Sequence, residues 1–296
     1  MSITKPPACQ AVGSWAVCKN VWRSRPGHGI LIYMKLTILS DNNTLIDQYL
    51  LGEPGFCCLV EAEGKRFLLD TGYFGIFAQN AEALGISWRD VDGVVLSHCH
   101  DDHTRGLCAF FTEGKRPRLV AHPGLFRRVV SRGLSIGCPY SRDTLERYFD
   151  LRLSAEPLPL TENLFYLGAI PRLDPLDQDQ ALRQGDDGAD FTPDDTALAY
   201  RGKEGVYVIT GCSHSGIGNI LEQAKRVTNE NRIMGVIGGF HLRQMDDRAA
   251  RAIRYLKGER IPCLYPCHCT SLSVKVALGN EMHIEEVGAG TSLEWV

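Results

Sequence analysis

Short apolar runs alternate with stretches of helical periodicity from Met34 to the C-terminus. Residues 56–62 (FCCLVEA) and 66–72 (RFLLDTG) predict two strands joined as a hairpin around Glu63-Gly64. The apolar spacing of residues 76–86 predicts a helix that ends at Gly85. By the same criteria, strands are expected at 91–97, 118–123, 196–202, 205–211, 232–239 and 261–267, and helices at 216–228 and 246–258.

Strands that cluster first and then alternate with helices, repeated in two halves, indicate two sheets covered by outer helices. We therefore predict a four-layer α/β sandwich over residues 34–296. Residues 1–33 carry little periodicity and are predicted to be an N-terminal extension outside the core fold. Residues 124–152 are predicted to be helical on both sides of a break that contains Gly and Pro, and the polar, acidic segment 174–195 is predicted to be a long loop.

Composition narrows the class of protein. With 296 residues, 44% of them hydrophobic, the chain can bury a large core. A formal net charge of -3 gives no electrostatic reason to expect nucleic acid or a membrane as partner. The sequence has neither an apolar run long enough to span a bilayer nor the order of a secretory signal, so we expect a cytoplasmic protein with a small-molecule substrate. The sequence does not specify an oligomeric state.

The eleven cysteines are scattered and several adjoin histidines, which favours reduced thiols over disulfides. Cys57 and Cys58 lie in an apolar segment and are predicted to be core residues. A separate structural zinc site at Cys263, Cys267 and Cys269 is disfavoured, because their spacing has no matching second pair.

Residues capable of binding metal follow the ends of five predicted strands. They are Asp70, the group that begins at His98, His214, His241 and His268. Ligands at the ends of core strands are held on rigid elements while one side stays open to solvent. We therefore expect a shared site at this edge of the sheets.

The densest group is SHCHDDH, residues 97–103. In a loop after a strand, His98 and His100 turn to one side while Asp102 and His103 face another. We expect one ion bound by the first pair with a distant histidine, and a second ion bound by the second pair with another; His214 and His268 are the candidates. Imidazole and carboxylate ligands suit zinc best, with manganese or iron as alternatives.

This SHCHDDHTRGL stretch resembles the His-x-His-x-Asp-His signature of the metallo-β-lactamase superfamily, and FLLDTG (67–72) resembles its preceding Asp-bearing strand. Four later segments resemble a narrower branch of that superfamily. Its members are named either metal-dependent hydrolases or synthases of 7,8-dihydropterin-6-methyl-4-(β-D-ribofuranosyl)aminobenzene-5'-phosphate. The four segments are TGCSHSGIGNIL (210–221), IGGFHL (237–242), PCHCTS (266–271) and VGAGTSLEW (287–295).

The resemblance implies an αββα sandwich with two divalent metal ions at the sheet edge. It also implies that Asp70 hydrogen-bonds a ligand histidine and fixes its tautomer. Where many superfamily hydrolases have a Gly-Asp whose carboxylate bridges the ions, this chain has Gly211-Cys212. Three possibilities follow: a bridging thiolate, a bridge of water alone, or partial metal occupancy. His241 is expected either to replace a ligand or to donate a proton to the leaving group.

The expected function is hydrolysis of an ester, foremost a phosphoester, by a metal-bound hydroxide, with Asp102 both binding metal and orienting the nucleophile. Arg172, Arg243 and Lys275 are candidates for neutralising a substrate phosphate, or else are ordinary surface charges. Two alternatives stay open: a pterin-related synthase or iron-dependent redox protein of the same fold, and a non-catalytic metal-dependent sensor.

Overall fold

The structure, a computed structural model, describes residues 33–173, 183–185 and 188–296. The chain divides into two units, Met1–Leu31 and Ile32–Val296. The first unit lies outside the described residues, and so does the predicted extension 1–33 apart from Tyr33. That prediction stays a prediction, and the description below concerns the second unit.

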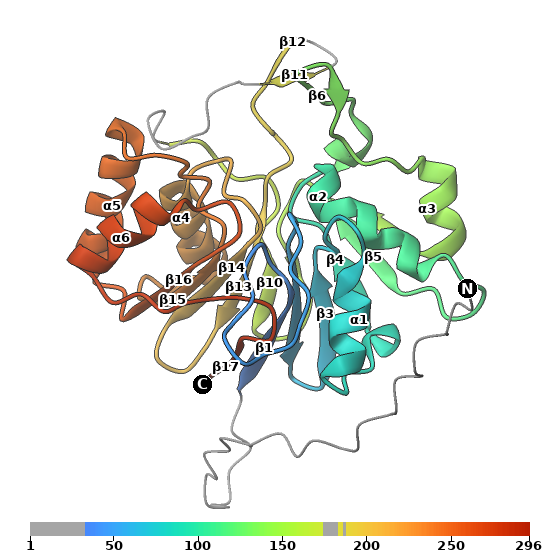
Figure 1. The fold of residues 1–296 in the computed structure, drawn as a ribbon, viewed down its shortest axis with the longest axis horizontal. Coiled ribbons are helices and arrows are strands. Elements are labelled where there is room, and N and C mark those ends of the chain that lie inside the picture. The colour runs from blue at the N-terminus through green and yellow to red at the C-terminus, as the bar shows by residue number, and fades with distance from the viewer. Residues whose placement is uncertain (1–32, 174–182, 186–187) are drawn as a thin grey trace, which may run out of the picture. The chain divides into compact units, whose positions relative to one another are not determined.

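Two large sheets dominate this unit (Figure 1). The first has seven strands, in the order β17 (Ser292–Trp295), β1 (Met34–Ser40), β2 (Cys57–Ala62), β3 (Lys65–Leu69), β4 (Gly93–Val95), β5 (Arg118–Ala121) and β8 (Asp150–Leu153). The second has six, in the order β16 (Cys263–Pro266), β15 (Ile233–Gly238), β14 (Val206–Thr210), β13 (Ala197–Arg201), β10 (Leu164–Tyr166) and β9 (Leu158–Pro159).

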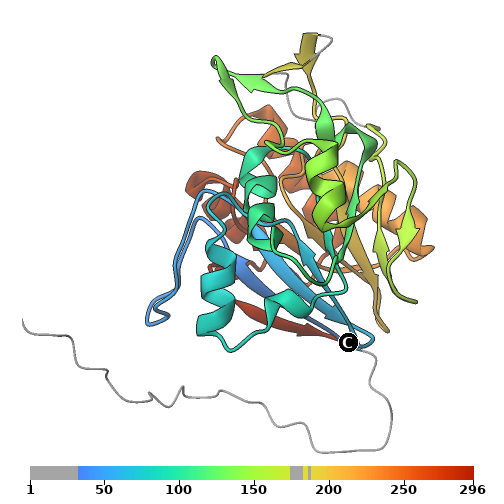
Figure 2. The same cartoon turned by 90° about the vertical axis from the view of Figure 1, so that its right-hand side faces the viewer.

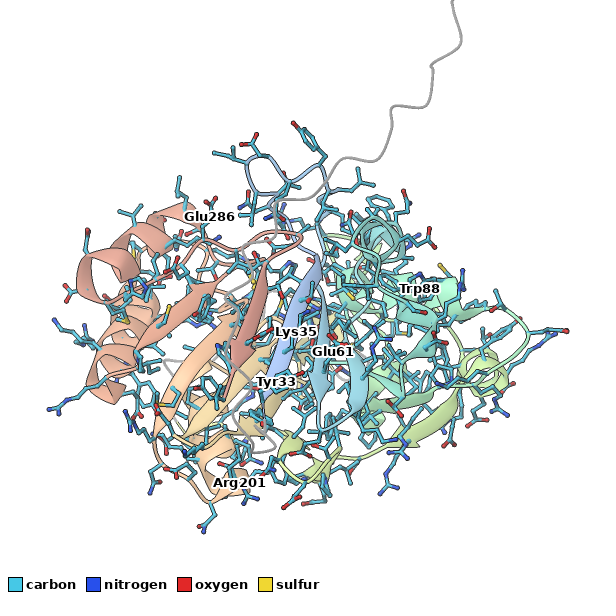
Figure 3. The ribbon with its side chains drawn as sticks, turned by 90° about the horizontal axis from the view of Figure 1, so that it is seen from below. Tyr33, Lys35, Glu61, Trp88, Arg201 and Glu286 are labelled. Atoms are coloured by element: carbon cyan, nitrogen blue, oxygen red, sulfur yellow. The ribbon has the colours of Figure 1, made fainter. Side chains whose placement is uncertain are left out.

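The predicted hairpin is present as β2–β3, and the strands expected at 196–202 and 205–211 form a second one, β13–β14; each pairs antiparallel. In contrast, β3–β4–β5–β8 and β14–β15–β16 pair in parallel, so their carboxyl ends lie at one edge of each sheet. In the view from below (Figure 3), Lys35 and Glu61 lie on neighbouring strands, where they are direct partners in the β1–β2 register. Opposite charges in such cross-strand positions stabilise the pairing.

Both faces of the strands are buried, and they face different layers. In β2, Cys58 and Val60 pack between the two sheets while Cys57 packs under the outer helices of the first sheet. In β14, Ile209 points between the sheets and Val208 points toward the helices of the second. Because side chains alternate along a strand, a chain that is apolar on both faces requires a layer on each side. The prediction that Cys57 and Cys58 are core residues is confirmed.

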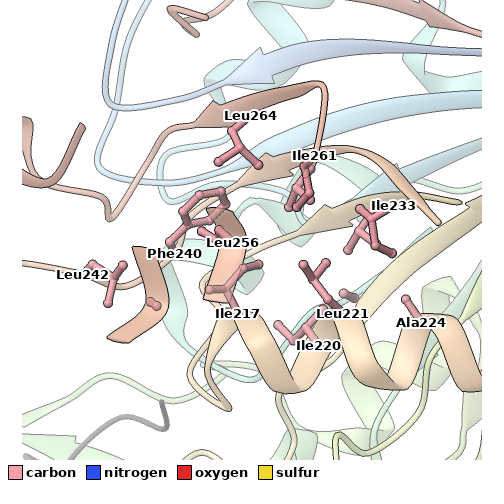
Figure 4. Packing of buried hydrophobic residues seen from close by; sticks show 14 of the residues in the cluster. Ile217, Ile220, Leu221, Ala224, Ile233, Phe240, Leu242, Leu256, Ile261 and Leu264 are labelled. Carbon is pink, nitrogen blue, oxygen red and sulfur yellow. The ribbon is translucent and has the colours of Figure 1, made fainter. Parts of the chain in front are cut away.

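The outer layers are helical, and the predicted αββα sandwich is confirmed (Figure 1). The first sheet is covered by α1 (Ile76–Ala83) and α3 (Arg142–Tyr148), and the second by α4 (Ile217–Thr228), α5 (Asp247–Glu259) and α6 (Leu272–Glu281). Figure 4 shows how apolar residues of α4 and α5, among them Ile217, Leu221 and Leu256, pack onto strand residues of the second sheet. The α3, α5 and α6 helices begin where Ser141, Asp246 and Ser271 cap them by accepting a backbone N–H.

The expected helix at 124–130 is wrong. This segment is a short 3₁₀ turn (Pro123–Phe126) followed by an extended chain and the hairpin β6 (Val130–Ser131) and β7 (Leu134–Ser135). Leu125 and Val129 are buried four residues apart, which imitates helical spacing. Arg127 lies between them and makes ion pairs with the buried carboxylates of Asp190 and Asp194, which hold the chain extended.

Within the predicted loop 174–195 the structure instead has two short strands, β11 (Arg183–Gly185) and β12 (Gly188–Asp190); residues 174–182 and 186–187 lie outside the described residues. These two strands join β6 and β7 in a third, four-stranded sheet. In both Figure 1 and Figure 2 this sheet projects beyond the ends of the two large sheets. Across the described ranges, no helix has the length and apolar character needed to cross a membrane.

Candidate metal centre

The predicted metal-binding residues come together where the parallel strands end. The short helix α2 (Asp101–Thr104) follows β4 and lies over the upper ends of the strands in Figure 1. His100 is its N-cap residue and has an extended backbone, with φ -62° and ψ 148°. The change from extended to helical backbone at His100 separates the side chains before it from those after it. It therefore lets one loop contribute to two groups of candidate ligands.

The first group contains His98, His100 and His214. Their nearest ring nitrogens all lie within 4.8 Å of one another, and all three residues are buried. The ring centroids of His98 and His214 are 4.7 Å apart, and those of His100 and His214 are 4.9 Å apart. Three buried imidazoles that converge on one point fit the donor set of a zinc site that keeps an open position.

The second group contains Asp102, His103 and His268, whose ligand atoms also lie within 4.8 Å of one another. Asp102 Oδ2 is 3.7 Å from His103 Nε2 and 3.6 Å from His268 Nε2. Burial alone would raise the pKa of Asp102, but the positive charges on His103 and His268 outweigh it and lower that pKa. Asp102 is therefore a carboxylate, the form that binds a cation.

Cys212 lies between the two groups. Its Sγ is 3.2 Å from His103 Nε2, and it shares a cluster of ligand atoms with His98 of the first group and His103 of the second. Of the three possibilities raised by the Gly-Cys sequence, this position fits a bridging thiolate. The structure thus brings together all six predicted ligands and Cys212; that they bind metal stays a prediction.

Hydrogen bonds on the far side of the rings orient the histidines. Asp70 Oδ2 accepts from His103 Nδ1 and from Ser97 Oγ, each at 2.7 Å. Because the Ser97 hydroxyl donates to Asp70, it accepts from His98 Nδ1 at 2.9 Å. Both rings therefore keep a proton on Nδ1, so Nε2 is the atom that would bind a cation once any proton there has been released.

His268 is oriented in the same way from another loop. Its Nδ1 lies 2.8 Å from Asn42 Oδ1, which accepts the hydrogen bond, and its backbone N–H donates to Asp41 at 2.9 Å. Neither Asn42 nor Asp41 could be recognised from the sequence as a partner of His268, because both follow β1 more than two hundred residues earlier in the chain.

Backbone strain collects at the same edge. Asp70, Ser213, His241 and His268 all have a left-handed backbone, with φ of 61°, 56°, 49° and 49°. Each follows the end of a strand, in the order β3, β14, β15 and β16. Such conformations cost about 1–3 kcal/mol each and persist only where the surrounding structure enforces them. Their clustering is typical of a functional site.

Gly211 is required by the same arrangement. A Cβ there would lie 2.1 Å from Ser97 Oγ and 2.7 Å from Asp70 Oδ2, the two atoms that orient His98 and His103. We expect Gly211→Ala to lower the free energy of unfolding by about 1–3 kcal/mol, as measured by urea denaturation. Gly258→Ala in α5 is the matched control, since its Cβ meets no atom within 4 Å, and we expect it to stabilise by about 0.5–1 kcal/mol. Equal stability of Gly211→Ala and the natural protein would contradict this assignment.

A cavity of about 380 Å³ opens onto both groups. Beyond the metal-binding candidates, its lining includes Tyr73, His241 and Arg243. Arg243 Nη2 is 2.8 Å from His241 Nε2; because a guanidinium only donates, the proton of the His241 imidazole is on Nδ1. His241 also lies beside His214, with ring centroids 4.2 Å apart.

The other two candidate phosphate-binding cations lie elsewhere. Arg172 donates to the backbone carbonyls of His214, Phe191 and Thr192, and so holds loops together. Lys275 lines a different cavity, next to Asp41 and Glu285. Of the three, only Arg243 lines the cavity that opens onto both groups; the cavity that Lys275 lines reaches His268 alone of the candidate ligands.

Cys269 is the neighbour that sequence reasoning missed. It lines the cavity and belongs to a cluster of ligand atoms with Cys212 and His268. Burial alone would raise the pKa of the Cys269 thiol, but the hydrogen bond with Cys212 and the nearby His268 and His241 lower it to about 5. The three cysteines considered for a separate zinc site point to different places. Cys267 lies in the core, and Cys263 clusters with His283 and Glu285.

Comparison with known proteins shows the family of this fold. The profile of the Metallo-beta-lactamase superfamily matches residues 50–126. The uncharacterized protein MJ0448 of Methanocaldococcus jannaschii is 30% identical over 249 residues, covering 82% of this chain and 93% of that protein. The 7,8-dihydropterin-6-methyl-4-(beta-D-ribofuranosyl)-aminobenzene-5'-phosphate synthase of the same organism is 27% identical over 262 residues, covering 82% of this chain and 89% of the synthase.

One solved structure is similar over almost its whole length. Tm1679, described as a metal-dependent hydrolase of the β-lactamase superfamily, superposes with a TM-score of 0.77 at 28% sequence identity. The match covers 88% of this chain and 98% of Tm1679.

Proposed function

Since this chain belongs to the metallo-β-lactamase superfamily, we propose that it is a metal-dependent hydrolase of small esters, and specifically of phosphoesters. The observation that carries the proposal is the pair of converging ligand groups, with Cys212 between them, at the floor of an open cavity. At about 380 Å³ the cavity has the size of a small-molecule site. We propose that its partner is a small-molecule substrate, and not nucleic acid or a membrane.

The residues present fit two divalent ions. His98, His100 and His214 would hold one, and Asp102, His103 and His268 the other. Nitrogen, oxygen and sulfur donors in this combination suit zinc, with iron as an alternative. When bound, such ions supply a nucleophile from water near neutral pH and stabilise negative charge that develops on the substrate.

The chain's own residues would orient and protonate the reactants. Asp102 is ionised between His103 and His268, and we propose that it also orients the nucleophile. His241 belongs to neither group of three among the residues that the structure describes, which favours the role of proton donor over that of ligand. The hydrogen bond from Arg243 to Nε2 leaves a neutral ring with its single proton on Nδ1. To act as the proton donor, His241 would release Arg243 and take a second proton on Nε2, and this imidazolium would then protonate the leaving group.

Arg243 gives the preference for phosphate. We expect Arg243→Ala to lower kcat/KM for bis-p-nitrophenyl phosphate by roughly 10–100-fold, the effect of losing one hydrogen bond to a charged group. Turnover of the uncharged ester p-nitrophenyl acetate should fall much less. Lys275→Ala, in the other cavity, is the control and should change neither rate by more than about twofold. An equal loss for both substrates in Arg243→Ala would contradict a role in phosphate recognition.

Turnover by the metal-loaded protein tests the function itself. A panel of a phosphomonoester, a phosphodiester, a lactone and a thioester should include at least one substrate, with the phosphoesters fastest. No turnover of any member would contradict the hydrolase proposal. Turnover of the carboxylic esters alone would contradict the phosphoester class.

The likeness to the synthase favours one second candidate, a pterin-related synthase. Such an enzyme would consume a dihydropterin and leave bis-p-nitrophenyl phosphate intact. Following both compounds in parallel assays with one preparation of metal-loaded protein separates the two functions.

A further inference from the structure

A second sulfur lies beside the second ligand group. Cys269 follows His268 on the loop after β16, and the ligand atoms of Cys212, His268 and Cys269 all lie within 4.8 Å of one another. Both sulfurs also line the cavity. Cys269 therefore has the two properties of a ligand: closeness to other donors, and access to the space where an ion would lie.

The neighbouring backbone makes room for this sulfur. A Cβ at Gly239 would lie 2.5 Å from Cys269 Sγ, closer than any side chain can approach. The sulfur thus occupies the space that a larger residue at position 239 would fill. A glycine at the end of β15 is what allows the loop after β16 to place its thiol against the site.

A fixed hydrogen bond points at the same atom. The backbone N–H of His241 donates to Cys269 Sγ at 3.2 Å, and the left-handed backbone of His241, with φ 49°, aims it. Backbone N–H donors to a ligand sulfur stabilise its anionic, metal-binding form.

Packing does not account for the position of Cys269. Its neighbour Cys267 belongs to the core between the sheets, whereas Cys269 belongs to none of the three apolar clusters of the described residues. Buried cysteines that serve packing behave as small apolar residues. Cys269 instead faces polar donors and the cavity.

We propose that Cys269 is a ligand for the ion that Asp102, His103 and His268 would hold, so that this ion would have a thiolate ligand from Cys269 besides any contribution from Cys212. This inference rests on the proposed metal centre. Its consequence is selectivity: thiolates favour zinc or iron and disfavour manganese and magnesium, which prefer oxygen. The second subsite would therefore take up zinc in the presence of excess manganese.

Cobalt(II) reports sulfur ligands directly, through a thiolate-to-metal absorption band in the near ultraviolet. The full-length protein, stripped of metal, is titrated with cobalt beside Cys269→Ser, Cys212→Ser and the exposed-cysteine control Cys108→Ser. We expect the band to weaken in each of the first two variants and to be unchanged in the control. Affinity for the second cobalt ion should fall at least about tenfold in Cys269→Ser. An undiminished band in Cys269→Ser with both ions bound would overturn the proposal.

A second measurement uses the natural protein and so does not depend on how the variants fold. Alkylation by iodoacetamide, followed by mass spectrometry of the peptides, should be slowed by zinc at Cys269 and not at Cys108. Equal labelling of Cys269 with and without zinc would also overturn the proposal. These outcomes can be told apart from failure of the proposed function. If zinc protects Cys269 but the protein hydrolyses no substrate, Cys269 is a ligand and only the hydrolase proposal is contradicted.

Discussion

Asp102→Asn is expected to lower kcat/KM for a phosphodiester at least about a thousandfold. The carboxylate lies between His103 and His268, with Oδ2 within 3.7 Å of both ring nitrogens. Asparagine preserves the size of the side chain and removes the charge that holds the cation. Loss of several kcal/mol of electrostatic stabilisation in the transition state corresponds to a factor of this size.

Asp101→Asn provides the matched control for that substitution. Asp101 is the preceding residue of α2, and burial together with the charge of Asp102 raises its pKa to about 6. Asp101 belongs to neither ligand group among the described residues. Asp101→Asn should therefore lower kcat/KM far less than Asp102→Asn does. Steady-state kinetics and metal content of both purified variants check the comparison. Similar losses in the two would show that charge around α2, and not ligation by Asp102, determines the rate.

Removing metal is expected to lower the melting temperature by about 10 °C. Three imidazoles converge in one group, and two imidazoles and a carboxylate in the other, and four residues at this edge have left-handed backbones. An ion that binds only the folded state adds about 4 kcal/mol at a concentration a thousand times its Kd. For a chain of this length, each kcal/mol shifts the melting temperature by roughly 2–4 °C.

Differential scanning calorimetry with zinc and with a chelator measures this shift. Asp102→Asn should show a smaller shift than the natural protein, because it keeps only the first group of ligands intact. If the natural protein has the same melting temperature with zinc and with the chelator, the converging side chains bind no ion.

The fold and most of the site were predictable because their signals are local. The αββα layers follow from short, continuous apolar runs and from apolar spacings of three to four residues, and the signature loop supplies four candidate ligands within residues 98–103. His214 and His268 were found by the same reasoning, since each follows an apolar strand. These features need no knowledge of which strands become neighbours.

What the sequence could not predict depends on contacts between distant segments. In the sequence, Cys269 lies close to Cys263 and Cys267. It comes near Cys212 only when β14 and β16 have both paired with β15. Asn42 reaches His268 across 226 positions of sequence. The extended chain at Arg127 is likewise held by Asp190 and Asp194, more than sixty residues further on, whereas local spacing alone suggested a helix.

The wide separation of the ligand loops also sets an order of events during synthesis. Residues 98–103 leave the ribosome long before His268, and the sheet that carries His268 is completed by β16, near the end of the chain. The first sheet itself needs β17, the last strand, beside β1. Chains are made from the N-terminus at about 5–20 residues per second, and distant contacts form late. The 165 residues that follow His103 up to His268 take roughly 8–33 s to make at this rate. The nascent chain therefore carries its histidine-rich loop for that time before His268 exists, and the second ion would bind only after it.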